Sequence, residues 1–188
     1  MTIPHQTDED IAKLVQNGDH EVFGLIVERY EGKMLRYARK FLFGHQDSQD
    51  LVQEVFLKAY TNIRGFDASR KFSSWLYRIA HNEFINAIKK RGREPISIFD
   101  PDTIFPHLAA SDNPEQDLDK EQVKMLLNDC LDRLDVKYRE PLVLYYFEDL
   151  DYQQISEIMR IPMSTVGVRL SRGRQLLKQI YDQSTSRP

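Results

Sequence analysis

The residues best suited to contact a charged polymer lie near the C-terminus, in the stretch IPMSTVGVRLSRGR at 161–174. A proline-containing turn is followed by Ser-Thr-Val and then by three arginines within six residues. Arginine forms paired hydrogen bonds with guanine edges, and the N-terminus of a helix attracts phosphate. The stretch therefore suits a helix that lies in a DNA groove. An ordinary amphipathic helix with a solvated basic face is the alternative at this point.

Helical phase sorts the side chains of this stretch, at about 100° per residue. The apolar side chains fall on one side, at Val166, Leu170, Leu177, Ile180 and Tyr181. A capping box at Asp151 and Gln154 predicts a short preceding helix over 152–159, and Ser164 is expected to cap the next helix. This order is the helix-turn-helix pattern. It predicts outward or flanking DNA contacts from Ser164, Thr165, Val168, Arg169, Ser171, Arg172 and Arg174.

Residues for other chemistry are sparse. The five histidines are scattered without ligand spacing, and no glycine-rich phosphate loop is present. The single cysteine, Cys130, falls on an apolar helical stripe and is expected in the core. We therefore expect no enzyme activity, no metal and no cofactor. An acidic N-terminus without an apolar signal core and the lack of a membrane-length apolar run predict a cytoplasmic protein.

The net charge of −3 conceals a strong asymmetry. Seven Lys and Arg residues stand against three acids over 66–94, and six bases stand against one acid from 160 to the end. Between these blocks, 100–121 has seven acids and one lysine. Two basic blocks separated by an acidic stretch suggest two surfaces for a polyanion, although solvated helix faces give similar patterns.

Apolar residues recur at helical spacing along most of the chain, which predicts an all-α protein. Thr7 with Asp10 resembles a capping box, and Ser73 or Ser74 is expected to cap a helix that carries Trp75. Prolines and acids interrupt the helical pattern after about residue 92. We therefore expect two small helical domains, a bundle at 1–92 and a helix-turn-helix domain at 114–188, joined by a flexible linker at 93–113 that could extend to roughly 70 Å.

Four blocks in order resemble bacterial sigma-70 family factors, and most of all the two-domain extracytoplasmic-function type. They are DSQDLVQEVFLKAY (47–60), KFSSWLYRIAHNEFIN (71–86), KYREPLVLYYFEDLDYQQISEIM (137–159) and IPMSTVGVRLSRGR (161–174). The resemblance covers the chain from about Asp8 to Ile180. It implies a factor that binds bacterial core RNA polymerase and directs promoter recognition, DNA melting and transcription initiation, and it implies an anti-sigma factor as a further partner.

The resemblance also implies roles for individual residues. Binding to core polymerase falls on Asp50, Gln53, Glu54, Phe56 and Lys58. Recognition and melting of the minus-10 DNA fall on Phe66, Arg70, Lys71, Arg78, Asn82, Lys89, Lys90 and Arg91, with Asn82 facing an extruded base. Trp75 is expected in the core. The C-terminal helix-turn-helix would read duplex minus-35 DNA in the major groove.

Two departures from the family pattern bear on the backbone and on DNA reading. Arg160 occupies a turn position where the family commonly has glycine, so the backbone there is expected to be strained. Gly167 and Val168 replace a polar pair, and Gly167 costs about 1 kcal/mol of helix propensity relative to alanine.

The alternative functions are a conventional helix-turn-helix regulator, which does not need the 71–86 block, and a helical adaptor, which leaves both basic blocks unexplained.

Overall fold

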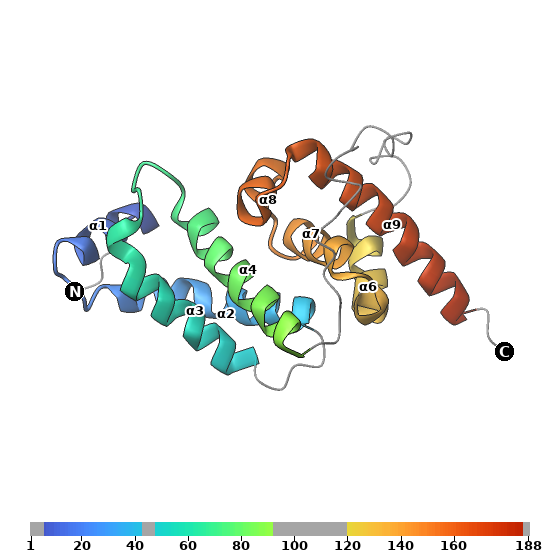
Figure 1. Cartoon of the computed structure of the whole chain (residues 1–188), viewed down its shortest axis with the longest axis horizontal. Helices are drawn as coiled ribbons and strands as arrows, with labels where there is room; N and C mark the ends of the chain where they lie inside the picture. Colours follow the sequence, from blue (N-terminus) through green and yellow to red (C-terminus); the bar gives the residue numbers. More distant parts are fainter. Residues whose placement is uncertain (1–5, 43–47, 92–119, 186–188) are drawn as a thin grey trace.

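Apolar residues at helical spacing build two groups of helices that follow one another along the chain (Figure 1). The computed structural model describes residues 6–42, 48–91 and 120–185, and within these ranges every regular element is a helix. The N-terminal unit comprises α1 (Asp8–Gln16), α2 (Phe23–Leu42), α3 (Ser48–Asn62), the 3-10 helix η1 (Ile63–Gly65) and α4 (Phe72–Arg91). The C-terminal unit comprises α6 (Lys120–Cys130), the 3-10 helix η3 (Leu131–Arg133), α7 (Val136–Tyr146), α8 (Tyr152–Met159) and α9 (Met163–Thr185).

The all-helical prediction is thus confirmed, while the predicted linker at 93–113 lies outside the described residues. No helix within the described ranges is both long enough and apolar enough to cross a bilayer.

Local capping explains where several helices begin. Both predicted capping boxes are present: the Asp10 amide donates to Thr7 Oγ1 at 3.1 Å, and the Gln154 amide donates to Asp151 Oδ1 at 2.8 Å. The expectation that Ser73 or Ser74 caps α4 is wrong, because the helix already begins at Phe72. Likewise, α9 begins at Met163, before Ser164.

An aromatic core lies at the centre of the N-terminal unit. Tyr37 and Phe41 of α2 are fully buried, and the Tyr37 ring lies 5.1 Å from the ring of Phe84 on α4. Burial of such large side chains contributes about 1.5–3 kcal/mol each. The helices α2, α3 and α4 therefore form one packed body that positions the surface of α4.

The C-terminal unit is organised around α9, which packs on α6, α7 and α8. Gly173 permits the closest approach of α9 to α7, since a Cβ atom there would lie 2.9 Å from Leu142 Cδ1. Cys130 is buried in this unit, as predicted. Pro141 lies within α7, yet the helix continues to Tyr146.

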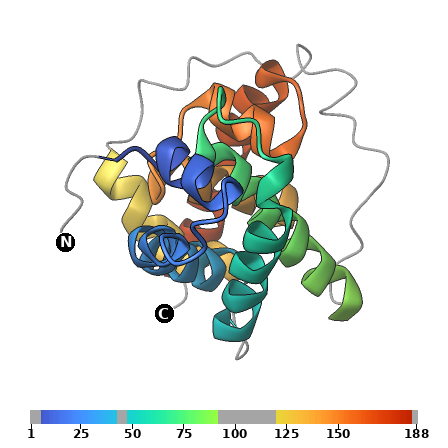
Figure 2. The same cartoon turned by 90° about the vertical axis from the view of Figure 1, so that its left-hand side faces the viewer.

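The two units pack directly on each other. Helix α4 packs on α8 (Figure 1), and α2 packs on α7. A view onto the N-terminal helices shows the helices of the C-terminal unit behind them (Figure 2). Hydrogen bonds from α2 and α4 to Glu140 of α7 and to Glu148 also join the two units.

Candidate nucleic-acid and polymerase interfaces

A hollow at the junction of α3 and α4 contains the residue predicted to face an extruded base. Its volume is about 360 Å³, and Asn82 is exposed on its wall. Trp75 and Ile79 contribute apolar surface, and Asn62 contributes a second side-chain amide. An apolar wall with amide groups can hold an unstacked base, because its ring stacks while its edge forms hydrogen bonds.

Four cations line a second hollow of about 420 Å³ beside the first. Arg70 and Lys71 belong to the loop that joins η1 to α4, Arg78 to α4 and Arg160 to the end of α8. Glu157 and Asp67 also line it, and an exposed ion pair of 3.8 Å joins Asp67 to Arg70. The structure thus brings three of the predicted minus-10 cations together and adds Arg160, which sequence reasoning had assigned only a backbone role.

The remaining predicted minus-10 residues divide into exposed and buried ones. Lys89 and Lys90 are exposed near the end of α4, and Arg91 is its last residue. Phe66 was expected to contact DNA, but it is 5% exposed and packs edge-on against Phe72 at 5.3 Å. It also lies 5.1 Å from the half-buried Trp75. Phe66 therefore belongs to the apolar layer under the loop and contributes only a small exposed area to the lining of the cationic hollow.

One face of α3 carries most of the predicted polymerase contacts. Asp50 and Gln53 are exposed and Glu54 is half-buried. Leu57 completes the i, i+3, i+4, i+7 spacing of this face and is 57% exposed, although sequence reasoning did not select it. The sequence does contain an indication of this exposure, because the apolar Leu57 falls outside the helical phase of the buried Val52 and Val55.

Two other predicted polymerase contacts on α3 are turned elsewhere. Phe56 is 8% exposed and continues the buried stripe of Val52, Val55 and Ala59, so its assignment to the polymerase surface is corrected. Lys58 donates to Glu83 on α4 at 2.6 Å and lies 3.5 Å from Glu54. The hydrogen bond to Glu83 raises the pKa of Lys58. Lys58 thereby joins α3 to α4 at the edge of the Asn82 hollow.

Along α9, the predicted outward side chains differ in exposure. Ser164 is exposed, and Ser171, Arg172 and Arg174 are half-buried. Thr165, Val168 and Arg169 are 0%, 3% and 7% exposed. The predictions that Val168 faces outward, that Arg169 flanks this face and that Thr165 is accessible at the helix start are therefore wrong for this arrangement. A helical wheel considers one helix by itself, whereas α9 packs on three helices and buries a wider arc.

The turn before α9 has the backbone that the family comparison predicted. Arg160 adopts φ 54° and ψ 45°, which is the left-handed region. Its amide donates to Ser156 O, so the strained residue ends α8 and reverses the chain. This geometry is costly for any residue with a Cβ atom, since the Cβ crowds the following carbonyl oxygen.

A buried carboxylate of α7 joins the two units. Glu140 is 1% exposed, and its Oε1 accepts a hydrogen bond from Tyr37 Oη on α2 at 2.5 Å. The same oxygen lies 2.6 Å from His81 Nδ1 on α4. Burial, followed by the charge of Glu140, raises the pKa of Tyr37 well above its ordinary value. One carboxylate therefore links α7 to both α2 and α4.

A second acidic residue and a buried arginine extend this interface. Glu148 accepts hydrogen bonds from Arg36 Nε at 2.8 Å, from Arg36 Nη2 at 2.9 Å and from Tyr77 Oη at 2.6 Å. Arg139 donates to Phe41 O at the end of α2 at 3.0 Å and to Leu134 O at 2.7 Å. Sequence reasoning missed all of these residues, because no local pattern brings α2 and α7 together.

Comparison with known proteins agrees with this architecture. The family model Sigma-70 region 2 matches residues 26–94, and Sigma-70, region 4 matches residues 124–177. The ECF RNA polymerase sigma factor SigW of Bacillus subtilis is 35% identical over 179 residues, which cover 90% of this chain and 95% of SigW. The ECF RNA polymerase sigma-E factor of Haemophilus influenzae is 33% identical, covering 92% of this chain and 94% of that protein.

The fold is shared with a solved structure, that of CnrH in complex with the cytosolic domain of CnrY. It aligns with a TM-score of 0.69 and 22% identity, and the alignment covers 95% of this chain and 99% of that one. The region 2 match includes most of α2, all of α3 and all of α4, and the region 4 match lies within the C-terminal unit. The chain belongs to the sigma-70 family and is an extracytoplasmic-function RNA polymerase sigma factor.

Proposed function

We propose that the two helical units of this sigma factor divide promoter recognition between them. Residues 1–92 bind core polymerase and open the minus-10 DNA, residues 93–113 connect the units, and residues 114–188 read the minus-35 element. The observation that carries this assignment is the adjacency of the Asn82 hollow and the cationic hollow along α4. A single DNA strand needs a cationic surface for its phosphates and a recess for an unstacked base.

The polymerase contact falls on the exposed face of α3. Asp50, Gln53 and Glu54 provide hydrogen-bond acceptors and donors, and the exposed Leu57 provides apolar area at the same face. An apolar side chain surrounded by polar ones is typical of the centre of a protein interface. This proposal keeps the predicted acidic residues and replaces Phe56 by Leu57.

The minus-35 contact falls on α8 and α9. Ser164 is exposed at the first turn of α9, and Arg172 and Arg174 retain partial exposure. Thr165, Val168 and Arg169 have to become accessible before they touch DNA. In the described arrangement the minus-35 contact therefore rests on Ser164, Ser171, Arg172 and Arg174.

Reconstitution tests the assignment. The full chain is added to bacterial core polymerase with a library of promoters, and transcripts and thymine reactivity in the minus-10 region are measured. We expect promoter-specific initiation that depends on the chain. Strong binding to duplex promoters by the chain alone, without initiation in the presence of core enzyme, would support a conventional regulator.

The chain acts here as a specificity subunit without catalysis of its own, in the cytoplasm where polymerase and DNA meet. A protein antagonist that binds the sigma factor and withholds it from polymerase is a further prediction. Copurification of the full chain from its native cells, with and without added core polymerase, tests for such a partner.

A further inference from the structure

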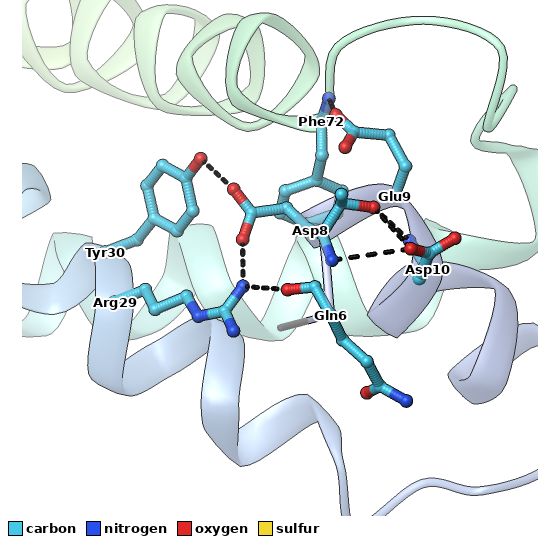
Figure 3. Close-up of polar contacts among 8 residues, drawn as sticks. Gln6, Asp8, Glu9, Asp10, Arg29, Tyr30 and Phe72 are labelled. Atoms are coloured by element: carbon cyan, nitrogen blue, oxygen red, sulfur yellow. Dashed lines mark hydrogen bonds and ion pairs between the residues drawn. The ribbon is translucent and has the colours of Figure 1, made fainter. Parts of the chain in front are cut away.

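Helix α1 contacts both ends of the loop that carries Arg70 and Lys71. The loop at 66–71 begins after η1 and ends where α4 starts. At its first end, Gln16 Nε2 of α1 donates to Ile63 O at 2.7 Å and to Phe66 O at 2.8 Å. At its second end, Glu9 Oε1 of α1 accepts the Phe72 amide at 2.8 Å (Figure 3).

The Glu9 carboxylate lies at the N-terminus of α4, where it satisfies an amide that has no partner within the helix. The helix dipole favours a negative charge at this position. Gln16 is suited to the other end, because its amide group offers two donors to two carbonyl oxygens. Each residue therefore matches the backbone group that it meets.

Helix α1 is itself firmly attached to α2. Asp8 accepts hydrogen bonds from Arg29 Nη1 at 2.7 Å and from Tyr30 Oη at 2.6 Å (Figure 3). Burial, together with Asp8, raises the pKa of Tyr30 well above its ordinary value, so its hydroxyl remains a donor. Ile11 and Val15 are buried against the bundle. Glu9 and Gln16, which bind the ends of the loop, thus belong to a helix that is itself held in place by the bundle.

Within the loop, the backbone is also ordered by its own side chains. Asp67 Oδ1 accepts the Ser69 amide at 3.0 Å and the Ser69 hydroxyl at 2.7 Å. The hydrogen bond from the Ser69 amide lowers the pKa of Asp67, so the carboxylate stays charged. Arg70 and Lys71 remain exposed on this ordered backbone. A cationic loop held in place loses less conformational entropy when it binds a strand.

We propose that Glu9 and Gln16 are positioning residues for promoter opening. Through these two residues, α1 fixes the 66–71 loop so that the cations of the loop, Arg70 and Lys71, are held beside the Asn82 hollow before DNA binds. This inference rests on the proposed minus-10 function of the loop. It assigns a role to a helix that precedes the region matched by the Sigma-70 region 2 model, which begins at residue 26.

Substitutions that change only these hydrogen bonds test the proposal. Gln16→Glu keeps the size of the side chain but places carboxylate oxygens against two carbonyl oxygens, and Gln16→Met removes the donors without adding charge. Glu9→Ala removes the acceptor at Phe72, whereas Glu9→Gln retains an acceptor. Lys13→Ala is the matched control, since Lys13 lies on the exposed face of α1 and forms an ion pair of 3.7 Å with Asp10 of the same helix.

Three measurements on the full chain separate positioning from general stability. Amide hydrogen exchange over 66–72 reports on the loop, binding to core polymerase reports on the α3 face, and open-complex formation is compared on duplex and pre-melted promoters. For Gln16→Glu and Glu9→Ala we expect faster loop exchange and about tenfold less open complex on duplex DNA. Polymerase binding should be unchanged, and the pre-melted promoter should restore initiation to within about twofold of wild type.

The proposal would be overturned if Gln16→Met and Glu9→Ala formed as much open complex on duplex promoters as the wild type does. It would also be overturned if the variants lost activity equally on duplex and pre-melted promoters and bound core polymerase more weakly. Glu9→Gln keeps the acceptor but loses the charge that the helix dipole favours, so its defect should be clearly smaller than that of Glu9→Ala, and Lys13→Ala should be silent. A defect in Glu9→Gln as large as in Glu9→Ala, or any defect in Lys13→Ala, contradicts the assigned hydrogen bonds. If the wild-type chain itself fails to open any promoter, the proposed function fails, and loop exchange in the variants still decides whether α1 holds the loop.

Discussion

His81 of α4 and Glu140 of α7 meet between the two helical units, with His81 Nδ1 2.6 Å from Glu140 Oε1. Tyr37 of α2 donates to the same carboxylate oxygen. A carboxylate as buried as that of Glu140 is costly unless it is paired, and removing one partner of a buried pair typically costs about 3–5 kcal/mol. The packing of one unit on the other therefore depends on the charge state of these residues.

The first prediction concerns pH. Burial lowers the pKa of His81, and the positive charges of Arg160 and Lys89 lower it slightly further. The negative charge of Glu140 and its hydrogen bond raise the pKa by more than these effects lower it, so the pKa of His81 lies above the ordinary 6.5. A raised pKa means that protonation stabilises the docked state. This contribution is complete below about pH 6.5 and is lost as the pH rises through the raised value.

Fluorescence transfer between labels on the two units of the full chain measures the docking from pH 6 to 9. We expect docking to weaken as the pH rises. Glu140→Gln removes the charge that raises the pKa of His81, and burial then lowers this pKa. Its docking should therefore be weaker than that of the wild type and should no longer weaken as the pH rises. An unchanged pH profile in Glu140→Gln would assign the dependence to another group.

The second prediction concerns the Asn82 hollow. Asn82→Ala removes an amide that can pair with a base edge, and a good bidentate contact contributes about 1–3 kcal/mol. We expect open-complex formation with core polymerase to fall by about tenfold or more, while binding of duplex minus-35 DNA persists. Asn86→Ala is the control, because Asn86 is exposed one turn further along α4 and does not line the hollow. Equal loss of both DNA activities in Asn82→Ala would make Asn82 structural.

The third prediction compares two glycines of α9. A Cβ atom at Gly167 would lie 3.6 Å from Tyr152 Cε2, an ordinary contact, so Gly167→Ala should stabilise the fold by up to about 1 kcal/mol through helix propensity. At Gly173 the Cβ would meet the buried Leu142 at 2.9 Å, and overpacking typically costs about 1–3 kcal/mol. The midpoint of urea denaturation should therefore rise for Gly167→Ala and fall for Gly173→Ala. Stabilisation by Gly173→Ala would show that α7 and α9 separate easily.

The fourth prediction tests the strained turn. Arg160→Gly should raise the free energy of unfolding by about 1 kcal/mol, because glycine adopts the left-handed region without the Cβ penalty. Arg160→Ala removes the same side chain but keeps a Cβ atom, so it should show no such gain. Thermal denaturation of both variants separates backbone strain from loss of the guanidinium. Equal stability of the two would mean that the turn is not strained.

Features that depend on neighbouring residues in the chain were predictable. The capping boxes at Thr7 and Asp151 form because donor and acceptor stand three residues apart. A strained backbone at the Arg160 turn was expected from the resemblance, because the family commonly has glycine there, and the structure places Arg160 in the left-handed region. The apolar phase of Leu170 and Leu177 likewise placed one side of α9 in the core.

Predictions of surface exposure were less secure, because exposure depends on every helix that packs nearby. Phe66 was expected at the DNA surface, yet it is covered by Phe72 and Trp75. Val168 was expected to face outward from α9 and Arg169 to flank that face, yet both are buried. Each of these side chains has a type that suits both DNA contact and packing, so residue type could not decide between them.

The sequence by itself determined the helices, their order and the two basic blocks, since these follow from local spacing and composition, and its four motif blocks carried the resemblance to the family. Only the tertiary structure decided that α1 meets both ends of the 66–71 loop, and that Glu140 lies between Tyr37 and His81. Such pairs are separated by 47 to 103 residues along the chain. Their partners are selected by shape and by the need to pair buried polar groups, which no local pattern records.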